Sequence, residues 1–118
     1  VIKSLKDGRR IKLFTDVFYT PIIVNELSRV VLKLIEGHNS GIFNVSSNER
    51  ISKYDFGIMI AKNFKFAKDL IIKDKLANRN DLVKRPFDMS LSNKKVVKTT
   101  GINIIPLQQQ ITYLNCNQ

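Results

Sequence analysis

An arginine and an aspartate, Arg85 and Asp88, stand three positions apart around a proline in the last third of this sequence. A planar guanidinium can bind two phosphate oxygens through parallel hydrogen bonds, so Arg85 is a candidate ligand for a phosphorylated small molecule. The structural alternative is that Arg85 pairs with a local carboxylate and that Asp88 accepts backbone N–H groups in a turn. The sequence leaves both interpretations open.

A second candidate is the aromatic segment at residues 15–21, which ends in a proline. Phe18 or Tyr19 could stack on a base or a sugar, because ligand pockets are lined by apolar and aromatic groups with few polar ones. The alternative is that both rings only pack this loop against the protein. Proline at position 21 favours an extended conformation for the residue before it.

Nucleophilic, disulfide and metal chemistry have little support. The chain contains one cysteine, Cys116, and one histidine, His38, which lies in a turn-like run of small polar residues. A catalytic Cys–His pair is therefore not expected, and neither is a metal site. A single thiol cannot form an internal disulfide, which favours a reducing compartment, so we expect a cytoplasmic protein.

The formal net charge is +10, and the basic residues are spread along the whole chain. There is no arginine-rich arm and no alternation of aromatic and basic residues. This pattern favours a solvated surface or an anionic small ligand, and a basic nucleic-acid-binding module is a remote alternative. No apolar run approaches the roughly 20 residues needed to cross a membrane. The chain begins with Val1 rather than Met, which suggests a piece of a longer protein.

Apolar periodicity and capping residues predict helices that alternate with short strands. Ser52 gives the clearest start signal, because this capping serine is followed three positions later by Asp55. Gly37 is expected to end the preceding helix in a left-handed conformation. The expected helices cover residues 1–6, 25–36, 52–64, 92–101 and 106–114, and the expected strands cover residues 11–14, 41–46 and 70–72. Ser92 is expected to cap the fourth helix, which should end near Gly101. The apolar faces expected on the third and the last helix are Phe56, Met59, Ile60 and Phe64, and Leu107, Ile111 and Leu114.

This alternation indicates an α/β fold with few short strands and several packing helices. The apolar run at residues 41–46 is typical of a buried parallel strand, which needs a neighbour on each side. Too few other strands are predicted to supply both neighbours, so we expect them to lie upstream of a single domain or fragment at residues 1–118. The helix at residues 25–36 should bury one apolar face, formed by Leu27, Val30, Val31, Leu34 and Ile35.

Four stretches in order resemble the C-terminal portion of dTDP-4-dehydrorhamnose reductase and its relatives among the extended short-chain dehydrogenase/reductases, including sugar-nucleotide epimerases and dehydratases. The resemblance runs from about Leu5 to Leu114. Together the four stretches are fairly specific to this superfamily and much less specific to one substrate. They lie at residues 16–28, 41–45 and 51–56, and at Arg85-Pro86 followed by Leu91, Lys95 and Gly101-Ile102.

The resemblance implies a Rossmann-type enzyme that acts on a nucleoside-diphosphate sugar with NAD or NADP. By similarity to the Arg-x-x-Asp pattern of related epimerases, Arg85 would bind the diphosphate and Asp88 a ribose hydroxyl, with Phe18 and Tyr19 as further substrate contacts. The sequence departs from the family at two positions. Some epimerases carry arginine where Tyr19 stands, and the reductases usually carry threonine where Ile22 stands.

The family's cofactor and acid/base motifs are missing from this chain. It contains no Gly-x-x-Gly-x-x-Gly or Gly-x-Gly-x-x-Gly, and none of its three tyrosines is followed four positions later by lysine. No catalytic and no cofactor-binding residue is therefore predicted here. The N-terminal nucleotide-binding Rossmann domain, which would bind NAD or NADP, is expected to be absent from this chain.

The predicted function is the substrate-binding C-terminal part of an NAD(P)-dependent sugar-nucleotide reductase or epimerase that is inactive alone. Its expected partners are a nucleoside-diphosphate sugar and its own N-terminal Rossmann domain, with a homodimer left open and no membrane expected. The alternative is a non-catalytic regulatory or nucleotide-sensing relative of the same fold.

Overall fold

The computed structural model describes residues 1–117, which divide into two compact units. The first unit comprises Val1–Tyr19 and Ile51–Met89, and the second comprises Thr20–Arg50 and the chain from Ser90 onward. Both therefore combine segments that are distant in the sequence. A single substrate-side domain at residues 1–118 stays a prediction.

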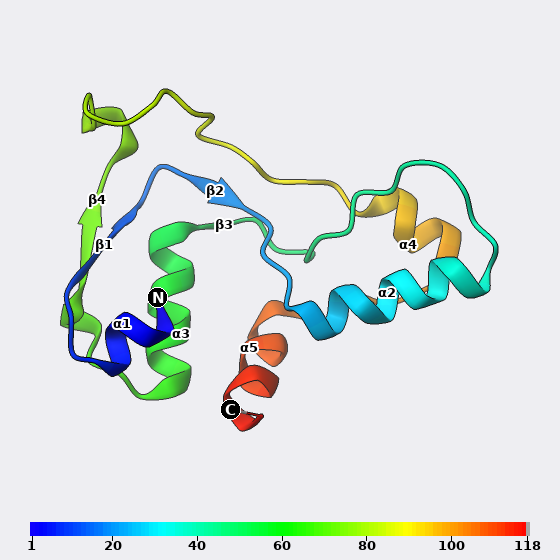
Figure 1. The fold of residues 1–118 in the computed structure, drawn as a ribbon, viewed down its shortest axis with the longest axis horizontal. Coiled ribbons are helices and arrows are strands. Elements are labelled where there is room, and N and C mark those ends of the chain that lie inside the picture. Colours follow the sequence, from blue (N-terminus) through cyan, green and yellow to red (C-terminus); the bar gives the residue numbers. More distant parts are fainter. Residues whose placement is uncertain (118) are drawn as a thin grey trace. The chain divides into compact units, whose positions relative to one another are not determined.

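The first unit is a small α/β structure in which a parallel pair of strands packs against a helix (Figure 1). Strand β1 pairs with β4 so that Ile11 lies opposite Ile71, and β2 pairs antiparallel with β3. The predicted strands near residues 11–14 and 70–72 are thus confirmed, whereas β2 lies inside the segment expected to be a loop. Its elements are α1 (Ile2–Lys6), β1 (Ile11–Phe14), β2 (Phe18–Tyr19), β3 (Ile51–Ser52), α3 (Lys53–Phe64), a 3-10 turn η1 (Lys68–Leu70), β4 (Ile71–Asp74) and a second 3-10 turn η2 (Leu76–Asn78).

Helix α3 begins as the capping signal predicts, because the Ser52 hydroxyl accepts a hydrogen bond of 3.0 Å from the backbone N–H of Asp55. Its buried face is narrower than the predicted aromatic stripe. Gly57, Ile60 and Ala61 are buried, and the larger Phe56, Met59 and Phe64 are only half-buried. Small residues bring α3 close to β1 and β4, and the core there contains Leu5, Ala61 and Ile71 with Ile11, Leu13, Tyr54, Ile58, Phe66 and Leu70 around them.

The second unit consists of helices α2 (Val24–Glu36), α4 (Lys94–Thr100) and α5 (Leu107–Cys116) with extended connections. Gly101 ends α4 in a left-handed conformation with φ 69°, as its place after the helix predicts. In α5, Leu107 and Ile111 are buried as expected from their spacing. The core of this unit contains Val30, Val96, Ile102 and Ile104, and Leu34, Phe43, Val45 and Val97 pack against it.

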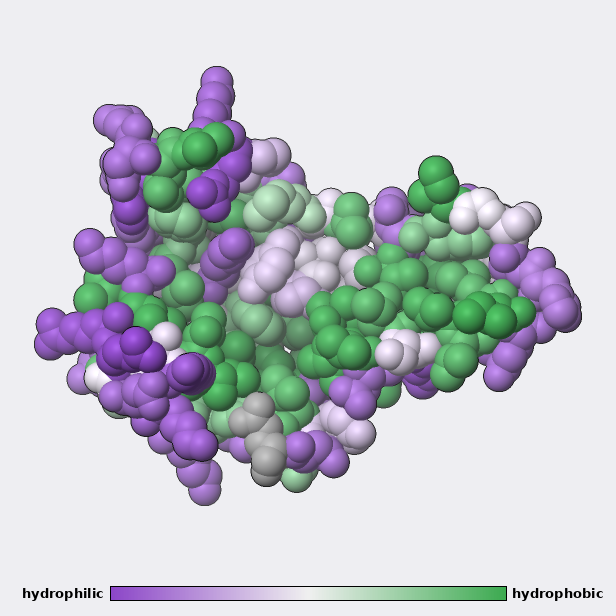
Figure 2. Space-filling view, viewed as in Figure 1, coloured by the Kyte–Doolittle hydropathy of each residue, from purple (hydrophilic) through white to green (hydrophobic). Residues whose placement is uncertain are grey.

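Helix α2 buries less of its apolar surface than predicted. Val30 is fully buried and Leu34 partly buried, but Leu27, Val31 and Ile35 are exposed. The apolar positions cover more of the helix circumference than the core of this unit can contact, so part of them faces outward. Figure 2 shows apolar side chains gathered over α2 in this view.

Three local predictions were wrong. Residues 41–46 form no strand in the described chain, and Ile42 is 85% exposed, because no neighbouring strand completes a ladder there. Gly37 has φ −80°, and the left-handed residue after α2 is His38 with φ 52°. Asn93 rather than Ser92 is the N-cap of α4, although the Ser92 hydroxyl accepts from the N–H of Lys94 at 3.4 Å.

Two kinds of feature are not found among the described residues. None of the helices combines the length and the apolar character that crossing a membrane requires. Residues 1–117 also contain no group of three or more histidine, cysteine, aspartate or glutamate side chains placed to hold a metal ion.

Candidate functional site

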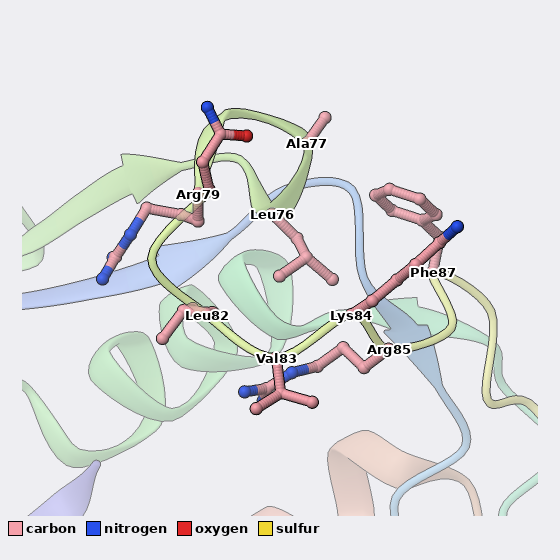
Figure 3. A pocket seen from close by; sticks show the side chains of 9 residues that line it. Leu76, Ala77, Arg79, Leu82, Val83, Lys84, Arg85 and Phe87 are labelled. Carbon is pink, nitrogen blue, oxygen red and sulfur yellow. The ribbon is translucent and has the colours of Figure 1, made fainter.

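Arg85 lies beside a hollow of about 360 Å³ in the first unit (Figure 3). The hollow is formed by the connection that follows β4, and Leu76 points into it from the 3-10 turn η2. Its wall combines apolar side chains with three cationic ones. The lining residues are Leu76, Ala77, Arg79, Asn80, Leu82, Val83, Lys84, Arg85 and Phe87.

The start of this connection is fixed by the carboxylate of Asp16. Its two oxygens accept hydrogen bonds from the backbone N–H groups of Leu76 and Ala77, at 2.8 and 3.0 Å. The pKa of Asp16 is lowered, although burial alone would raise it, because these N–H groups and nearby Lys75 favour the charged form. Asp16 therefore orders the first turn of the hollow's wall.

Arg79 is held by two carboxylates and is not free to bind a ligand. Its guanidinium donates to Asp81 through Nε and Nη2 at 2.9 and 2.8 Å, and to Asp74 through Nη1 at 2.9 Å. Hydrogen bonds from Arg79 are the first cause of the lowered pKa of Asp74 and of the pKa of about 2 at Asp81, and they raise the pKa of Arg79 in turn. This cation is thus internally neutralised.

Arg85, unlike Arg79, is not paired with a carboxylate of the described chain. Its side chain is exposed, and among residues 1–117 no carboxylate lies within ion-pair distance of its guanidinium. Figure 3 shows Arg85 extending past Val83, while the neighbouring Lys84 extends in another direction, towards Phe87. Arg85 therefore offers an unpaired guanidinium to solvent at the edge of an apolar hollow, and its phosphate-binding role stays a prediction.

The backbone brings Phe18 and Asp88 together. The N–H of Phe18 donates to the carbonyl of Phe87, and the N–H of Met89 donates to the carbonyl of Phe18, both at 2.8 Å. Phe18 and Asp88 thus form an isolated parallel bridge, which continues the small sheet of β2 and β3. The hollow beside Arg85, however, is not lined by Phe18, Tyr19 or Asp88.

Tyr19 is packed within its own unit. Its ring meets Phe56 edge-on, with centroids 5.7 Å apart and planes at 87°, and Lys53 Nζ lies 5.7 Å from the Tyr19 centroid. Burial raises the pKa of the Tyr19 hydroxyl to about 12. These contacts are what the packing interpretation of this loop predicts, and the neighbouring Lys53 had no signal in the sequence pattern.

The second unit contains a buried polar network that sequence reasoning missed. Glu26 is 3% and Gln110 2% exposed. Glu26 accepts from Arg29 and from the N–H of Ile105, while Gln110 accepts from the N–H of Ile23 and donates to the Ile105 carbonyl. Glu26 and Gln110 also line the adjacent hollow of about 190 Å³, but their polar atoms are paired within the network, so we interpret the network as structural. Its members are far apart in sequence, and only the acidic residue in the first turn of α2 gave a hint.

Comparisons with known proteins identify the family and the fold of this chain. The family model of the RmlD substrate binding domain matches residues 1–115. A dTDP-4-dehydrorhamnose reductase from Bacillus anthracis, solved in complex with NADP, has a TM-score of 0.85 to this chain at 17% identity, over 99% of this chain and 41% of that one. A reductase of the same name from Clostridium acetobutylicum has a TM-score of 0.82 at 25% identity, over 99% and 42%.

A hypothetical dTDP-4-dehydrorhamnose reductase from Sulfolobus tokodaii has a TM-score of 0.73 at 28% identity, over 89% of this chain and 37% of that one. The chain thus spans about two fifths of the length of the solved structures that it matches. Among curated proteins none matches. These likenesses confirm the predicted mixed α/β fold with few short strands and several helices.

Proposed function

Because the chain belongs to the RmlD substrate binding domain family, we propose that it is the substrate-binding part of an NAD(P)-dependent sugar-nucleotide reductase or epimerase. The ligand of this part would be a nucleoside-diphosphate sugar. The parent protein would transfer a hydride to or from the hexose ring, and this chain would be inactive alone. Similarity to reductases from several sources supports the reductase alternative more than the epimerase one.

The observation that carries the proposal is the unpaired guanidinium of Arg85 at the edge of the apolar hollow. A diphosphate presents oxygens that a guanidinium fork can bind in parallel, and the exposed position leaves Arg85 accessible to it. The apolar wall offers Leu76 and Phe87 as surfaces for a base or a sugar ring. Arg85 would thus hold the charge of the ligand while the wall holds its apolar part.

Asp88, Phe18 and Tyr19 belong to the proposal as further substrate contacts. The bridge keeps Phe18 adjacent to Asp88, and Asp88 follows Arg85 by three positions in the sequence. Asp88 would accept a hydrogen bond from a ribose hydroxyl, and the Phe18 ring would contact the base or the sugar. Tyr19 is the weakest of the three, because Phe56 and Lys53 already occupy positions around its ring.

The described residues do not fit the nicotinamide cofactor. A pyrophosphate cradle needs a glycine-rich turn from a strand into a helix, with free N–H groups at the helix start. The strand-to-helix turn from β3 into α3 has no glycine, and Ser52 already binds the N–H of Asp55. NAD or NADP would therefore be bound by another region of the parent protein, and no chemical step is assigned to residues of this chain.

That other region, an N-terminal Rossmann domain, is the proposed partner of the second unit. Val31, Leu32 and Ile35 of α2 are exposed, as is Ile42 in the segment that was expected to be a strand. Exposed apolar side chains that gather on one helix, as on α2, are typical of surfaces that another part of a protein covers. The partner's sheet would supply the neighbours that residues 41–46 lack in the described chain.

Titration of the full-length protein with dTDP- and UDP-sugars tests the proposal. Binding of at least one sugar nucleotide is expected, and Arg85→Ala should weaken it about ten- to hundred-fold, the scale of a hydrogen bond to a charged group. Lys62→Ala is the control, because it removes one exposed positive charge from α3 of the same unit and does not line the hollow, and we expect little change. Absence of binding to every sugar nucleotide, or an Arg85→Ala protein that binds like the wild type, contradicts the proposal.

A non-catalytic regulatory or nucleotide-sensing relative is the second candidate, and a parent sequence that also lacks the Tyr-x-x-x-Lys pair upstream of this chain would favour it. Both candidates predict binding, but only a reductase consumes NADH or NADPH with a 4-keto sugar nucleotide, and only an epimerase converts one sugar nucleotide into its epimer. Tight binding without any turnover by the full-length protein would support the sensing role.

A further inference from the structure

The hollow beside Arg85 is built on a connection without regular secondary structure after η2, so something must fix its shape. Residues 79–87 contain turns, bends and a proline but no helix or strand. An exposed connection of this kind would move freely unless side chains tie it to the adjacent elements. A loose wall could not hold the Arg85 guanidinium in one place for a ligand.

Arg79 and its two carboxylates provide such a tie. Asp74 is the last residue of β4 and its side chain is 17% exposed, whereas Asp81 lies in the connection and is 63% exposed. Arg79 binds both at once, so it joins the ordered end of a strand to the later turn that contains Asp81. We call this three-residue arrangement, Asp74, Arg79 and Asp81, the Arg79 clamp.

The two ends of the wall are fixed by other means. Asp16 binds the N–H groups of Leu76 and Ala77 before the clamp, and the Phe87 carbonyl accepts from the Phe18 N–H after it. Between these points the two ion pairs of the clamp are the only ones that the described residues make in the wall. It also neutralises Arg79, so the charge that remains for a ligand is that of Lys84 and Arg85.

We infer that Arg79 is a positioning residue, which acts on the ligand through the wall and places Arg85 without touching the ligand itself. This inference rests on the proposed function of Arg85. It predicts that removing the clamp weakens the same interaction that Arg85 makes, because the guanidinium of Arg85 is then no longer held where the phosphate arrives.

A double-mutant cycle tests the inference with dTDP as the ligand, measured by calorimetry on the full-length protein. Arg79→Gln should weaken dTDP binding about ten-fold, the scale at which supporting residues affect a site. The double variant Arg79→Gln/Arg85→Ala should bind no more weakly than Arg85→Ala alone, because the clamp acts only through Arg85. Arg79→Lys, which can pair with one carboxylate, should recover part of the affinity.

Each other result overturns the inference in a distinct way. Additive losses would mean that Arg79 acts independently of Arg85, as it would if it only stabilised the fold. Normal dTDP binding by Arg79→Gln, beside weakened binding by Arg85→Ala, would overturn the inference and leave the proposed function standing. If Arg85→Ala also binds dTDP normally, the proposed function falls as well.

If the Arg79→Gln protein does not fold, Asp81→Asn replaces it in the double-mutant cycle. Asp81 is the more exposed arm of the clamp, and the Asp74–Arg79 pair survives its substitution. The inference expects Asp81→Asn to weaken dTDP binding, by less than Arg79→Gln, and to be non-additive with Arg85→Ala. Unchanged affinity in this variant would overturn it.

Discussion

The buried carboxylate of Glu26 lies against the guanidinium of Arg29 one helical turn away, in a two-pronged contact whose Nε–Oε2 and Nη2–Oε1 distances are 3.0 and 2.5 Å. The same Arg29 donates to the carbonyl of Asn103, and the same Glu26 accepts from the N–H of Ile105. One ion pair thus connects α2 to the chain that leads into α5. The second unit depends on it, because its core is small.

Replacing Glu26 by glutamine should destabilise the protein by about 2 kcal/mol, since hydrogen bonds to charged groups contribute more than neutral ones and the site is buried. The measurement is the free energy of unfolding from urea denaturation. Glu36→Gln is the control, because Glu36 is exposed at the other end of the same helix and should change the stability by less than about 0.5 kcal/mol. Equal effects of the two substitutions would contradict the structural role of the pair.

The same pair should make stability depend on pH in the acid range. Hydrogen bonds from Arg29 are the first cause that lowers the pKa of Glu26 below its ordinary value of 4.5, and burial opposes them. A lowered pKa adds stability that is complete above pH 4.5 and is lost as the pH falls through the folded-state value. Urea midpoints measured from pH 7 to pH 3 should fall less steeply for Glu26→Gln than for the wild type. Parallel curves would refute this assignment.

The start of α3 offers a test of local capping. Ser52→Ala removes the acceptor for the N–H of Asp55 and should cost about 1 kcal/mol of stability, as N-cap replacements typically do. Ser92→Ala is the matched control, because Asn93 caps α4 and the Ser92 hydroxyl makes only a long contact of 3.4 Å with the Lys94 N–H. Thermal unfolding compares the two variants, and a larger effect at Ser92 would contradict the assignment of these caps.

The sequence predicted those features that depend on neighbouring residues. The cap at Ser52, the end of α4 at Gly101 and the face of α5 follow from local spacing, and the structure confirms them. Burial on α2 was predicted less well, because periodicity marks every apolar face and cannot tell which one the rest of the chain covers. The prediction of a strand around Ile42 was wrong for a related reason, since a strand forms only where a second strand donates and accepts backbone hydrogen bonds beside it.

In the candidate site, too, the features set by local sequence were predicted and those set by the fold were not. Arg85 could be selected from its type and its neighbouring proline, but the hollow beside it depends on a wall formed by residues up to eleven positions apart. The sequence analysis did not predict the Arg79 clamp, because the spacing of Asp74, Arg79 and Asp81 matches neither the helical nor the strand period. Ion pairs between residues of an irregular loop follow no regular sequence spacing, so these partners could be identified only from the structure.

The hydroxyl of Tyr19 should ionise only at a pH well above its ordinary pKa. Burial raises its pKa from an ordinary value of 10.0 to about 12. The folded state therefore keeps it neutral while an unfolded chain would ionise, so its contribution to stability is complete below pH 10 and is lost as the pH rises towards 12. A phenolate absorbance titration should lose its latest step in Tyr19→Phe and keep it in Tyr113→Phe, whose ring is 48% exposed. A latest step that survives Tyr19→Phe would disprove the burial of this hydroxyl.

Gln110 connects the start of α2 to the start of α5 through both ends of its amide. Its Oε1 accepts from the Ile23 N–H at 3.0 Å, and its Nε2 donates to the Ile105 carbonyl at 2.7 Å, while the side chain is almost completely buried. Gln110→Leu keeps a similar volume but leaves both backbone groups without this partner, so we expect a loss of about 2 kcal/mol. Gln109→Leu, at the exposed neighbouring position, is the control and should leave the urea midpoint nearly unchanged. If Gln110→Leu is as stable as the wild type, water can replace the amide and the network does not hold α2 to α5.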